Sequence, residues 1–339
     1  GGSVSFSPRT PTFAHALGAA DYEAVLCGRM HFGNTDQFHG FASRIHGDSG
    51  NAMSPEILGS GLNRTNGQTR YAVEVAGHGK NGFQAFDRSV TDKACEFIQN
   101  RKPDQNPYAL VVGMMLPHNP LVCSKEDFDY YDTWLPKPEP EPKSVIDRLH
   151  PAMKRWRERR GVNQLSPEQN HRAMAAYYGL VAELDRNLGR ITEAIGGSEE
   201  STNTVIVYTS DHGEHQGARG VYGKFSMYEE SAGIPFIAAG PDVPVGKVCK
   251  TPVSLVDTFS TAVECVGASL SDADSDLPGD SVWSIANDAN RDRTVFSEYH
   301  AVGSRHAAYM LRDLTHKYVH YAHEPAQLFD MESDPDELT

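Results

Sequence analysis

The chain has 339 residues, of which 39% are hydrophobic and 22% are charged, and its formal net charge at pH 7 is −14. This length is enough for two average domains or for one large α/β domain with an appendage. No apolar run reaches the length of about 18 residues that a membrane-spanning helix needs. The acidic excess argues against a nucleic-acid-binding surface, which requires clustered Lys and Arg. A bound anion is therefore expected in a local pocket.

The cysteines stand far apart in the sequence, and no two of them form a Cys-x-x-Cys pair. They are Cys27, Cys95, Cys123, Cys249 and Cys265. An odd and scattered set in a chain of this length is typical of free thiols and not of a disulfide framework. Free thiols slightly favour a cytoplasmic location. The localisation stays open, because the sequence does not allow a targeting signal to be assessed.

Helix and strand patterns alternate in the first third of the sequence. Residues 11–20 have the apolar spacing of a short helix, and residues 22–27 are rich in β-formers. Residues 33–85 are rich in Gly, Asn and His, show little periodicity and are expected to form long loops. Helical spacing returns at 87–100. Residues 108–115 are a continuous apolar run of strand length, as expected for a buried parallel strand.

The clearest helix pattern follows a Pro-rich, charged connector at 135–144. Ser166 is expected to cap this helix, Pro167 to occupy its first position and Gln169 to complete a capping box. Apolar residues then recur every three or four positions. This spacing predicts a helix over 167–195 with one buried face.

Two further buried strands are expected at 204–211 and 234–240. Helices and strands that alternate in this way predict an α/β fold with a mainly parallel central sheet and helices on both faces. Short strand patterns at 293–300, 306–313 and 316–322 predict a small antiparallel sheet near the end.

This change of character suggests a domain boundary. We expect residues 1–290 to form the α/β domain and residues 291–339 to form a small C-terminal antiparallel subdomain.

Charged and imidazole side chains follow three of the predicted strands at their carboxyl ends. Asp211 and His212 end one strand, His118 follows another, and Arg29 and His31 alternate after a third. In open α/β sheets, ligands bind beyond these ends. Each feature alone also fits a helix cap, a structural histidine or an exposed pair. Three strand ends that deliver such residues together indicate a ligand site.

The residue types suggest which ligands this site would hold. An Asp carboxylate beside an imidazole can bind a divalent cation, although two ligands alone bind weakly. Asp211 and His212 are therefore candidate metal ligands. Lys224, in the loop that follows, can hold an anion with its ammonium group.

Four segments carry a resemblance to a known family. "SDHGEHQGARGVYGKFSMYEESAGIPFIAAGP" (210–241) resembles the second signature region of the sulfatases, which belong to the alkaline phosphatase superfamily. "PTFAHALGAADYEAVLCGRMHFG" (11–33) is similar to their Gly-Lys-x-His region, especially in the choline-sulfatase-like branch. "MLPHNP" (115–120) and "QLFDMESDPDELT" (327–339) are similar to their Pro-His-x-Pro segment and C-terminal ending. The matches occur in order along nearly the whole chain.

The resemblance implies an alkaline-phosphatase-like fold and a role for each site residue. Asp211 and His212 would complete a Ca²⁺ site, with His in place of the Asn of many members. Lys224 would contact the sulfate oxygens and act as a catalytic and substrate-binding residue. His31 would lie beside the nucleophile. His118 would face the sulfate or the leaving-group oxygen, to which an imidazole with an ordinary pKa near 6.5 can donate a proton.

Two further positions are implied less directly. Arg29 stands where most members have Lys; it keeps the charge and gains a bidentate fork, so we expect it to act as an electrostatic clamp. His300, in "SEYHAVGS", resembles a segment that reaches the pocket rim and is a candidate substrate-binding residue. Cations placed in advance would stabilise the negative charge that builds up on the sulfate oxygens during transfer.

The family nucleophile is not found in these 339 residues. Sulfatases carry it in a C/S-x-P-S-R segment, as a Cys or Ser converted to formylglycine. "SFSPR" (5–9) has its Ser and Pro in the wrong order, and Cys27 lies inside a predicted strand. We therefore expect the chain to be a fragment that lacks its N-terminal nucleophile segment and first aspartate ligands, or a natural non-catalytic relative. As it stands, weak calcium binding and negligible turnover are expected.

The leading hypothesis is a sulfuric ester hydrolase that cleaves a small sulfate monoester. One alternative is a phosphodiesterase or phosphonate monoester hydrolase of the same superfamily, for which Mn²⁺ or Zn²⁺ would replace Ca²⁺. Another is a non-catalytic anion-binding protein. No nucleic-acid or membrane partner is expected. The sequence leaves open which ester is cleaved and whether the chain forms a homo-oligomer.

Overall fold

The computed structural model describes residues 7–32, 35–48, 70–102, 104–137, 139–270, 272–288, 292–300 and 304–338. Its helices are α1 (Phe13–Ala19), α2 (Arg70–Glu74), α3 (Gly82–Gln99), α4 (Lys125–Trp134), α5 (Lys143–Arg148), α6 (Pro151–Arg160), α7 (Pro167–Gly196), α8 (Glu229–Ala232), α9 (Asp257–Cys265) and α10 (Val282–Asn287). Short 3₁₀ turns lie at Val162–Gln164, Ala218–Gly220 and Asp272–Asp274.

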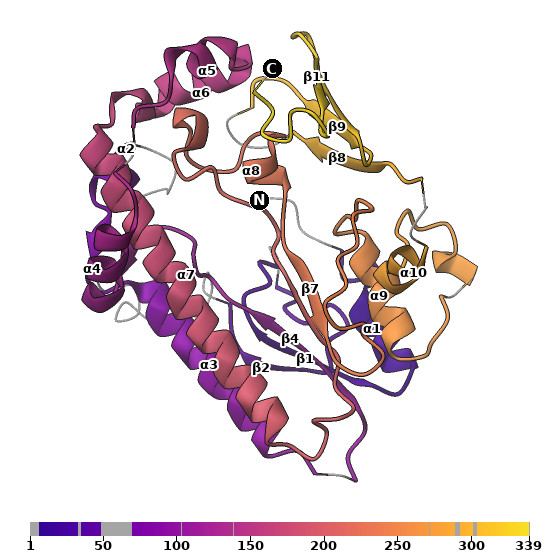
Figure 1. Cartoon of the computed structure of the whole chain (residues 1–339). Coiled ribbons are helices and arrows are strands. Elements are labelled where there is room, and N and C mark those ends of the chain that lie inside the picture. The colour runs from indigo at the N-terminus through magenta and orange to yellow at the C-terminus, as the bar shows by residue number, and fades with distance from the viewer. Residues whose placement is uncertain are drawn as a thin grey trace.

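A parallel sheet of three strands, in the order β2-β1-β4, forms the centre of the α/β part. Its strands are β2 (Ser43–His46), β1 (Glu23–Gly28) and β4 (Tyr108–Gly113). Strand β1 is buried on both faces because successive side chains point to opposite sides. Cys27 packs in the cluster beneath α3, and Leu26 packs in the cluster with α1 and α9. The expected sheet with helices on both faces is confirmed (Figure 1).

The strands expected at 204–211 and 234–240 form, but their pairing differs from the prediction of one continuous sheet. They appear as β6 (Ile206–Thr209) and β7 (Phe236–Ala239), which pair with each other in antiparallel orientation. A second two-stranded pair, β3 (Gly77–His78) with β5 (Val122–Cys123), is parallel.

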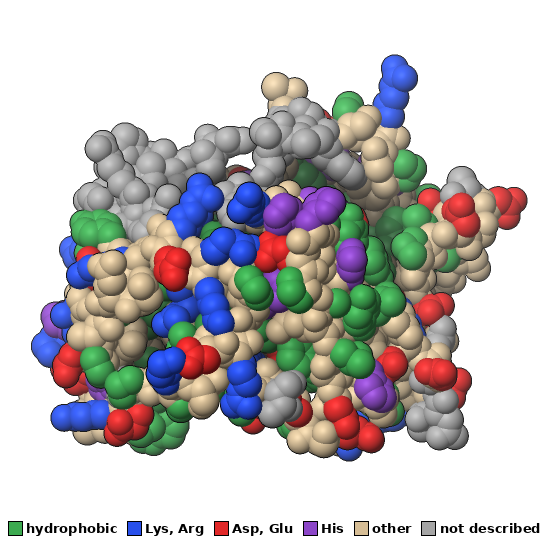
Figure 2. All heavy atoms as spheres, turned by 90° about the horizontal axis from the view of Figure 1, so that it is seen from above, with side chains coloured by type: hydrophobic (Ala, Val, Ile, Leu, Met, Phe, Trp, Pro, Cys, Tyr) green, Lys and Arg blue, Asp and Glu red, His purple; other side chains and the backbone are tan. Residues whose placement is uncertain are grey.

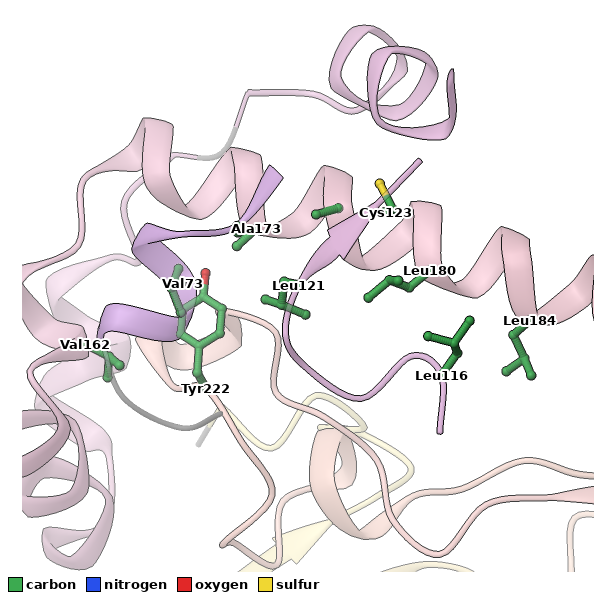
Figure 3. Packing of buried hydrophobic residues seen from close by; sticks show 11 residues of the cluster. Val73, Leu116, Leu121, Cys123, Val162, Ala173, Leu180, Leu184 and Tyr222 are labelled. Atoms are coloured by element: carbon green, nitrogen blue, oxygen red, sulfur yellow. The ribbon is translucent and has the colours of Figure 1, made fainter. Parts of the chain in front are cut away.

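Helix α7 is the long helix that the capping pattern predicts. The Ser166 hydroxyl accepts a hydrogen bond from the Gln169 amide at 3.2 Å, and the Ser166 amide donates to Gln169 Oε1 at 2.8 Å. Leu180 on its inner face is fully buried against Leu116 and Leu121 in the cluster of Figure 3. Burial of each such side chain stabilises the fold by about 1.5–3 kcal/mol. Helix α7 therefore fixes the chain that leaves strand β4.

The C-terminal antiparallel sheet is also confirmed, with the strand order β11-β10-β9-β8. Its strands are β8 (Val295–Tyr299), β9 (Ala308–Arg312), β10 (His316–Tyr321) and β11 (Gln327–Asp330), the last of which the sequence patterns did not indicate. The inner face of this sheet packs against Met153 of α6 and against Met227 and Tyr228. The boundary proposed at 290/291 falls on residues outside the described part and stays a prediction.

The prediction of long loops over 33–85 is wrong where the structure describes this region. Strand β2, helix α2 and the start of α3 lie inside it, and residues 49–69 lie outside the described residues. The connector at 135–144 ends at Lys143, where α5 begins.

All five cysteines are unpaired, as their spacing indicated. Among the described helices, none is both long and apolar enough to cross a membrane.

Candidate active site

The segment after strand β1 is held by a carboxylate that sequence reasoning missed. Asp48 Oδ1 accepts a hydrogen bond from Arg29 Nη1 at 2.6 Å, and Asp48 Oδ2 accepts from the His31 amide at 2.6 Å. The Asp48 side chain is only 4% exposed. The sequence pattern predicts that Arg29 and His31 alternate at the end of a strand. Strand β1 instead ends at Gly28, and His31 has φ 59°, so strand geometry does not orient these residues. Asp48 orients them instead.

His118 lies in the loop that follows strand β4, and Asp87 of α3 anchors the beginning of this loop. The two carboxylate oxygens of Asp87 accept hydrogen bonds from the Met115 and Leu116 amides, each at 2.8 Å. Asp87 is completely buried. Burial raises its pKa to about 7, against the two amide donors, which favour the carboxylate.

The two ring nitrogens of His118 differ in their hydrogen bonding. Its Nδ1 lies 2.8 Å from the Asn119 carbonyl oxygen, which can only accept a hydrogen bond, so Nδ1 carries the proton. The surrounding protein atoms and then Lys224 lower the pKa of His118 to about 4, although solvent still reaches the ring. At neutral pH the imidazole is therefore neutral, with a lone pair on Nε2. This pKa is lower than the ordinary imidazole value near 6.5 that the sequence led us to expect.

Asp211, His212 and Lys224 form the second half of the cluster. His212 Nδ1 donates to the Gly213 carbonyl at 2.9 Å, which leaves the lone pair of Nε2 to accept a hydrogen bond from Lys224 Nζ at 2.6 Å. Asp211 Oδ2 lies 3.3 Å from the same Nε2 atom and is largely exposed. Burial and then Lys224 lower the pKa of His212.

A partly buried carboxylate also shapes the loop that carries Lys224. Glu214 Oε1 accepts hydrogen bonds from the Gly223 amide at 2.6 Å and from the Gln216 amide at 3.2 Å. The two ends of the loop are thereby held together, directly before Lys224. Burial raises the pKa of Glu214. Burial lowers the pKa of Lys224, and Arg29 lowers it further.

The structure brings six of the predicted site residues together, all except His300. Besides the direct contact of Lys224 with His212, the charge of Lys224 lowers the pKa of both His31 and His118. Arg29 lowers the pKa of the same two histidines. Side chains from the ends of β1, β4 and β6 thus share one electrostatic environment, in which two cations face three imidazoles. The catalytic roles of these residues remain predictions.

His300 has different neighbours. Its Nε2 lies 3.0 Å from Glu298 Oε2, and its ring packs edge-on against Tyr309 with centroids 5.1 Å apart. The side chain is 49% exposed. Tyr299, the residue before it, points the other way toward Phe225. The substrate-binding role of His300 stays a prediction.

The two predicted metal ligands lie side by side, but the lone pair of His212 Nε2 accepts the hydrogen bond from Lys224, so a cation bound there would have to displace Lys224 Nζ. Asp211 Oδ2 and His212 Nε2 are 3.3 Å apart. His212 donates its other ring nitrogen to a backbone carbonyl, as metal-ligating histidines commonly do. Within the described ranges, no group of three or more His, Cys, Asp or Glu residues could hold a metal ion. The metal-binding role of Asp211 and His212 stays a prediction.

A set of buried and partly buried charges, which we call the C-terminal brace, joins the Lys224 loop to the C-terminal segment. Its members are Arg219, Glu229, Glu230, Lys317 and Glu337. Arg219 Nε lies 3.1 Å from Glu230 Oε1, and its Nη1 donates to the Glu337 carbonyl at 3.1 Å. Lys317 Nζ lies 2.5 Å from Glu337 Oε1 and 2.6 Å from Glu229 Oε1. The C-terminal sheet thus positions the loop that presents Lys224.

Sequence reasoning missed three carboxylates that orient the site: buried Asp48 and Asp87, and partly buried Glu214. Glu214 directly follows Asp211-His212-Gly213, so a search for a loop-stabilising acid beside that motif could have found it. Asp48 and Asp87 bond to backbone amides distant in the sequence, and no local pattern marks them.

Comparison with known proteins gives two overlapping family matches. A model described as "Sulfatase" matches residues 4–268, and one described as "N-sulphoglucosamine sulphohydrolase, C-terminal" matches residues 213–339. Among curated proteins, the chain is similar to a choline-sulfatase of Rhizobium meliloti, with 28% identity over 366 aligned positions, covering 99% of this chain and 68% of the relative. It is similar to arylsulfatase K of Homo sapiens, with 30% identity over 278 positions. That match covers 75% of this chain, which spans about half (51%) of the relative.

Solved structures with the same fold include enzymes of two chemistries. A structure described as a 2-O GAG sulfatase superposes with a TM-score of 0.73 and 18% identity, covering 99% of this chain and 70% of the other. The phosphonate monoester hydrolase of Agrobacterium radiobacter superposes with a TM-score of 0.71 and 17% identity, covering 99% and 76%. At these identities the likeness shows the fold alone.

Proposed function

Because the chain belongs to the sulfatase family, we propose that it provides the anion-binding half of an active site that hydrolyses sulfate monoesters. The observation that carries this proposal is the convergence of Arg29 and Lys224 with His118 beyond the strand ends. Two cations held in advance can bind the oxygens of a sulfate group and stabilise the charge that develops on them.

Arg29 and Lys224 differ in how they are held, and their proposed roles differ accordingly. Asp48 fixes the Arg29 guanidinium and compensates its charge, which leaves Arg29 as an oriented hydrogen-bond donor. Lys224 Nζ rests on the neutral nitrogen of His212 and keeps its full positive charge for an anion. We assign Lys224 the larger share of sulfate binding.

His118 is proposed to act on the leaving-group oxygen once substrate is present. In the free protein its pKa of about 4 leaves the ring unprotonated at neutral pH. A sulfate anion beside the ring favours the imidazolium form and raises the pKa. The ring would then hold a proton on Nε2 and deliver it to the oxygen of the departing alcohol.

The family generally uses a divalent metal, and we propose that Asp211 and His212 hold it in this chain. When bound, such an ion would polarise the sulfate oxygens as a Lewis acid. Ca²⁺ suits the carboxylate of Asp211, whereas the imidazole nitrogen of His212 also suits Mn²⁺ and Zn²⁺. The three ions therefore have to be compared directly.

Hydrolysis assays test the proposed activity. A binding assay tests whether the 339-residue chain supplies the anion-binding part of the active site. A chromogenic aryl sulfate and choline sulfate are offered to the chain, and to a form extended upstream by a C/S-x-P-S-R segment, with each of the three ions. We expect sulfate release from the extended form alone, and its loss in a Lys224→Gln variant. Binding of inorganic sulfate to the 339-residue chain, followed by calorimetry, should also depend on Lys224. Hydrolysis of a phosphonate monoester but of no sulfate ester would contradict the proposal.

A further inference from the structure

We propose that Arg160, Trp156 and Phe225 form a second anion subsite beside Lys224, which selects sulfate esters that carry another acidic group. This inference rests on the proposed function, because it names the substrate class of the same site. The additional acidic group would be a second sulfate or a carboxylate, carried by a part of the substrate about the size of a sugar. The subsite would recognise either group by its negative charge.

A continuous series of ring contacts leads from the active-site loop to Arg160. Phe225 directly follows Lys224, and its ring centroid lies 4.4 Å from that of Trp156. The guanidinium carbon of Arg160 lies over the Trp156 ring, 4.3 Å from its centroid. Tyr299 closes the other side of Phe225 at 5.7 Å. The pKa of Tyr299 is raised to about 12 by burial, an effect that the nearby Arg160 opposes.

Helix α6, which carries Arg160 and Trp156, is fastened to the active-site loop by two hydrogen bonds. Trp156 is buried, and its Nε1 donates to the Tyr222 carbonyl at 3.3 Å. Arg157 Nε donates to the Gly220 carbonyl at 2.8 Å. These bonds fix the position of the Arg160 guanidinium relative to Lys224. A fixed separation between two cations is what selects a ligand with two anionic groups.

Arg160 is partly buried and has no counter-charge among the described residues, unlike Arg155 and Arg157 on the same helix. Arg155 is paired with Glu324, and Arg157 is bonded to the loop. For Arg160, the described residues supply no ion pair, and its buried Nε has no hydrogen-bond partner among them. A half-buried guanidinium without an acceptor is costly, and an anionic ligand group would supply the missing acceptors. The planar fork of Arg suits both carboxylate and sulfate.

The wider surface agrees with this assignment. Lys and Arg side chains gather on the face seen from above, on the side where α5 and α6 lie (Figure 2). The overall charge of the chain is −14, so a basic region on this face is a local feature and not a consequence of composition.

The same geometry disfavours a cationic ester. Choline sulfate carries a quaternary ammonium group, and sites for such groups use aromatic faces that no protein cation occupies. Here Arg160 already covers the face of Trp156. We therefore expect the substrate preference of this chain to differ from that named for its choline-sulfatase relative.

Equilibrium binding to the full chain tests the subsite without requiring turnover. The probes are inorganic sulfate, glucose 6-sulfate, glucose 2,6-disulfate and choline sulfate, each titrated by calorimetry. Three variants are compared with the unaltered chain. Arg160→Gln removes the charge but keeps the length, and Arg160→Lys keeps the charge but loses the planar fork. Arg159→Gln is the matched control, because it removes an exposed charge from the adjacent position of the same helix.

We expect the unaltered chain to bind the disulfate roughly tenfold more tightly than the monosulfate, in line with one added charge-assisted contact. Arg160→Gln should lose most of this preference while it binds glucose 6-sulfate normally. Arg160→Lys should keep part of the preference, and Arg159→Gln should keep nearly all of it.

Other outcomes overturn the inference in distinguishable ways. If Arg160→Gln keeps the disulfate preference, or if choline sulfate binds most tightly, the subsite is wrong. The proposed function then still stands, provided that glucose 6-sulfate binding depends on Lys224. If no sulfated probe binds the unaltered chain, both the subsite and the proposed anion site fail together.

Discussion

The buried carboxylate of Asp87 and the amide of Leu116 are joined by a hydrogen bond of 2.8 Å, which attaches the loop carrying His118 to helix α3. Asp87 Oδ1 makes an equal bond with Met115. One side chain therefore determines where the chain turns after strand β4, although it does not itself face the active-site cluster.

Asp87 should make the stability of the protein depend on pH in a characteristic direction. Burial raises its folded-state pKa from 3.8 to about 7, so the folded protein keeps a proton that the unfolded chain releases. This contribution is complete below about pH 4 and is lost as the pH rises through about 7. Between pH 8 and pH 5.5, the free energy of unfolding should rise by on the order of 2 kcal/mol from this group. Urea unfolding of the unaltered chain and of Asp87→Asn measures the difference.

The Asp87→Asn variant should lack this rise and should also be less stable throughout. Its amide NH₂ group would face one backbone amide in place of an acceptor, which costs about 1–3 kcal/mol. An unchanged pH slope in the variant would show that another group is responsible.

His118 should be neutral at physiological pH in the free protein. Its pKa of about 4 has two main causes, burial and the charge of Lys224. In a Lys224→Met variant the second cause is removed, so the pKa should rise but stay below its ordinary value. Saturating sulfate should also raise the pKa in the unaltered chain. Ring carbon-bound proton shifts followed by NMR across pH 3–8 report both changes; titration of free His118 near pH 6.5 would rule out this description.

Gly113 and Arg29 approach too closely for any side chain at Gly113. A Cβ atom built on Gly113 would lie 1.7 Å from the Arg29 carbonyl oxygen. Gly113→Ala must therefore push the segment that carries Arg29 and His31 away from strand β4. We expect a loss of about 1–3 kcal/mol in the free energy of unfolding, together with weaker sulfate binding.

The matched control is Gly189→Ala on helix α7, where no atom lies within 4 Å of the added Cβ in the described structure. This change should be neutral or stabilising by up to about 1 kcal/mol, because Ala is the better helix former. Equal behaviour of the two variants in urea unfolding and in sulfate titration would refute the close-contact explanation.

The buried pair of Lys317 and Glu337 should be strongly coupled. Both side chains are 0% exposed, and Nζ and Oε1 lie 2.5 Å apart. Lys317→Met leaves buried Glu337 with only the more distant Arg219, at 3.7 Å, as a cation and should cost about 3–5 kcal/mol. The double variant Lys317→Met, Glu337→Leu removes both charges and should recover part of that loss. A double-mutant cycle by urea unfolding gives the coupling energy, and purely additive losses would mean that the two charges act independently.

Local signals in the sequence located several elements but not their partners. The capping box of Ser166 and Gln169 predicted the start of α7 at Pro167, because all of its hydrogen bonds lie within one turn. The apolar run at 108–115 predicted the position of β4 but not its burial, because every residue of this edge strand is only partly buried. The antiparallel pairing of β6 with β7 depends on contacts across the fold and could not be seen locally.

Elements with few buried residues could not be predicted from the hydrophobic spacing of the sequence. Helix α4 has no buried residue, and α6 buries only Met153 and Trp156, so neither shows an apolar stripe. In the candidate site, residues at the ends of strands could be predicted because the sheet itself brings them together. Asp48 could not, because its partners Arg29 and His31 are reached only through tertiary contacts.

The C-terminal brace also has a consequence for the order of events during protein synthesis. Lys224 leaves the ribosome well before Lys317 and Glu337, which complete the charge network behind its loop. Until those residues emerge, Arg219 lacks its C-terminal acceptors, and the loop is held by its hydrogen bonds to α6 and by its own contacts, such as the Glu214 bond to Gly223. A nascent chain should therefore gain its anion-binding site only after translation has passed Glu337, when the C-terminal sheet docks.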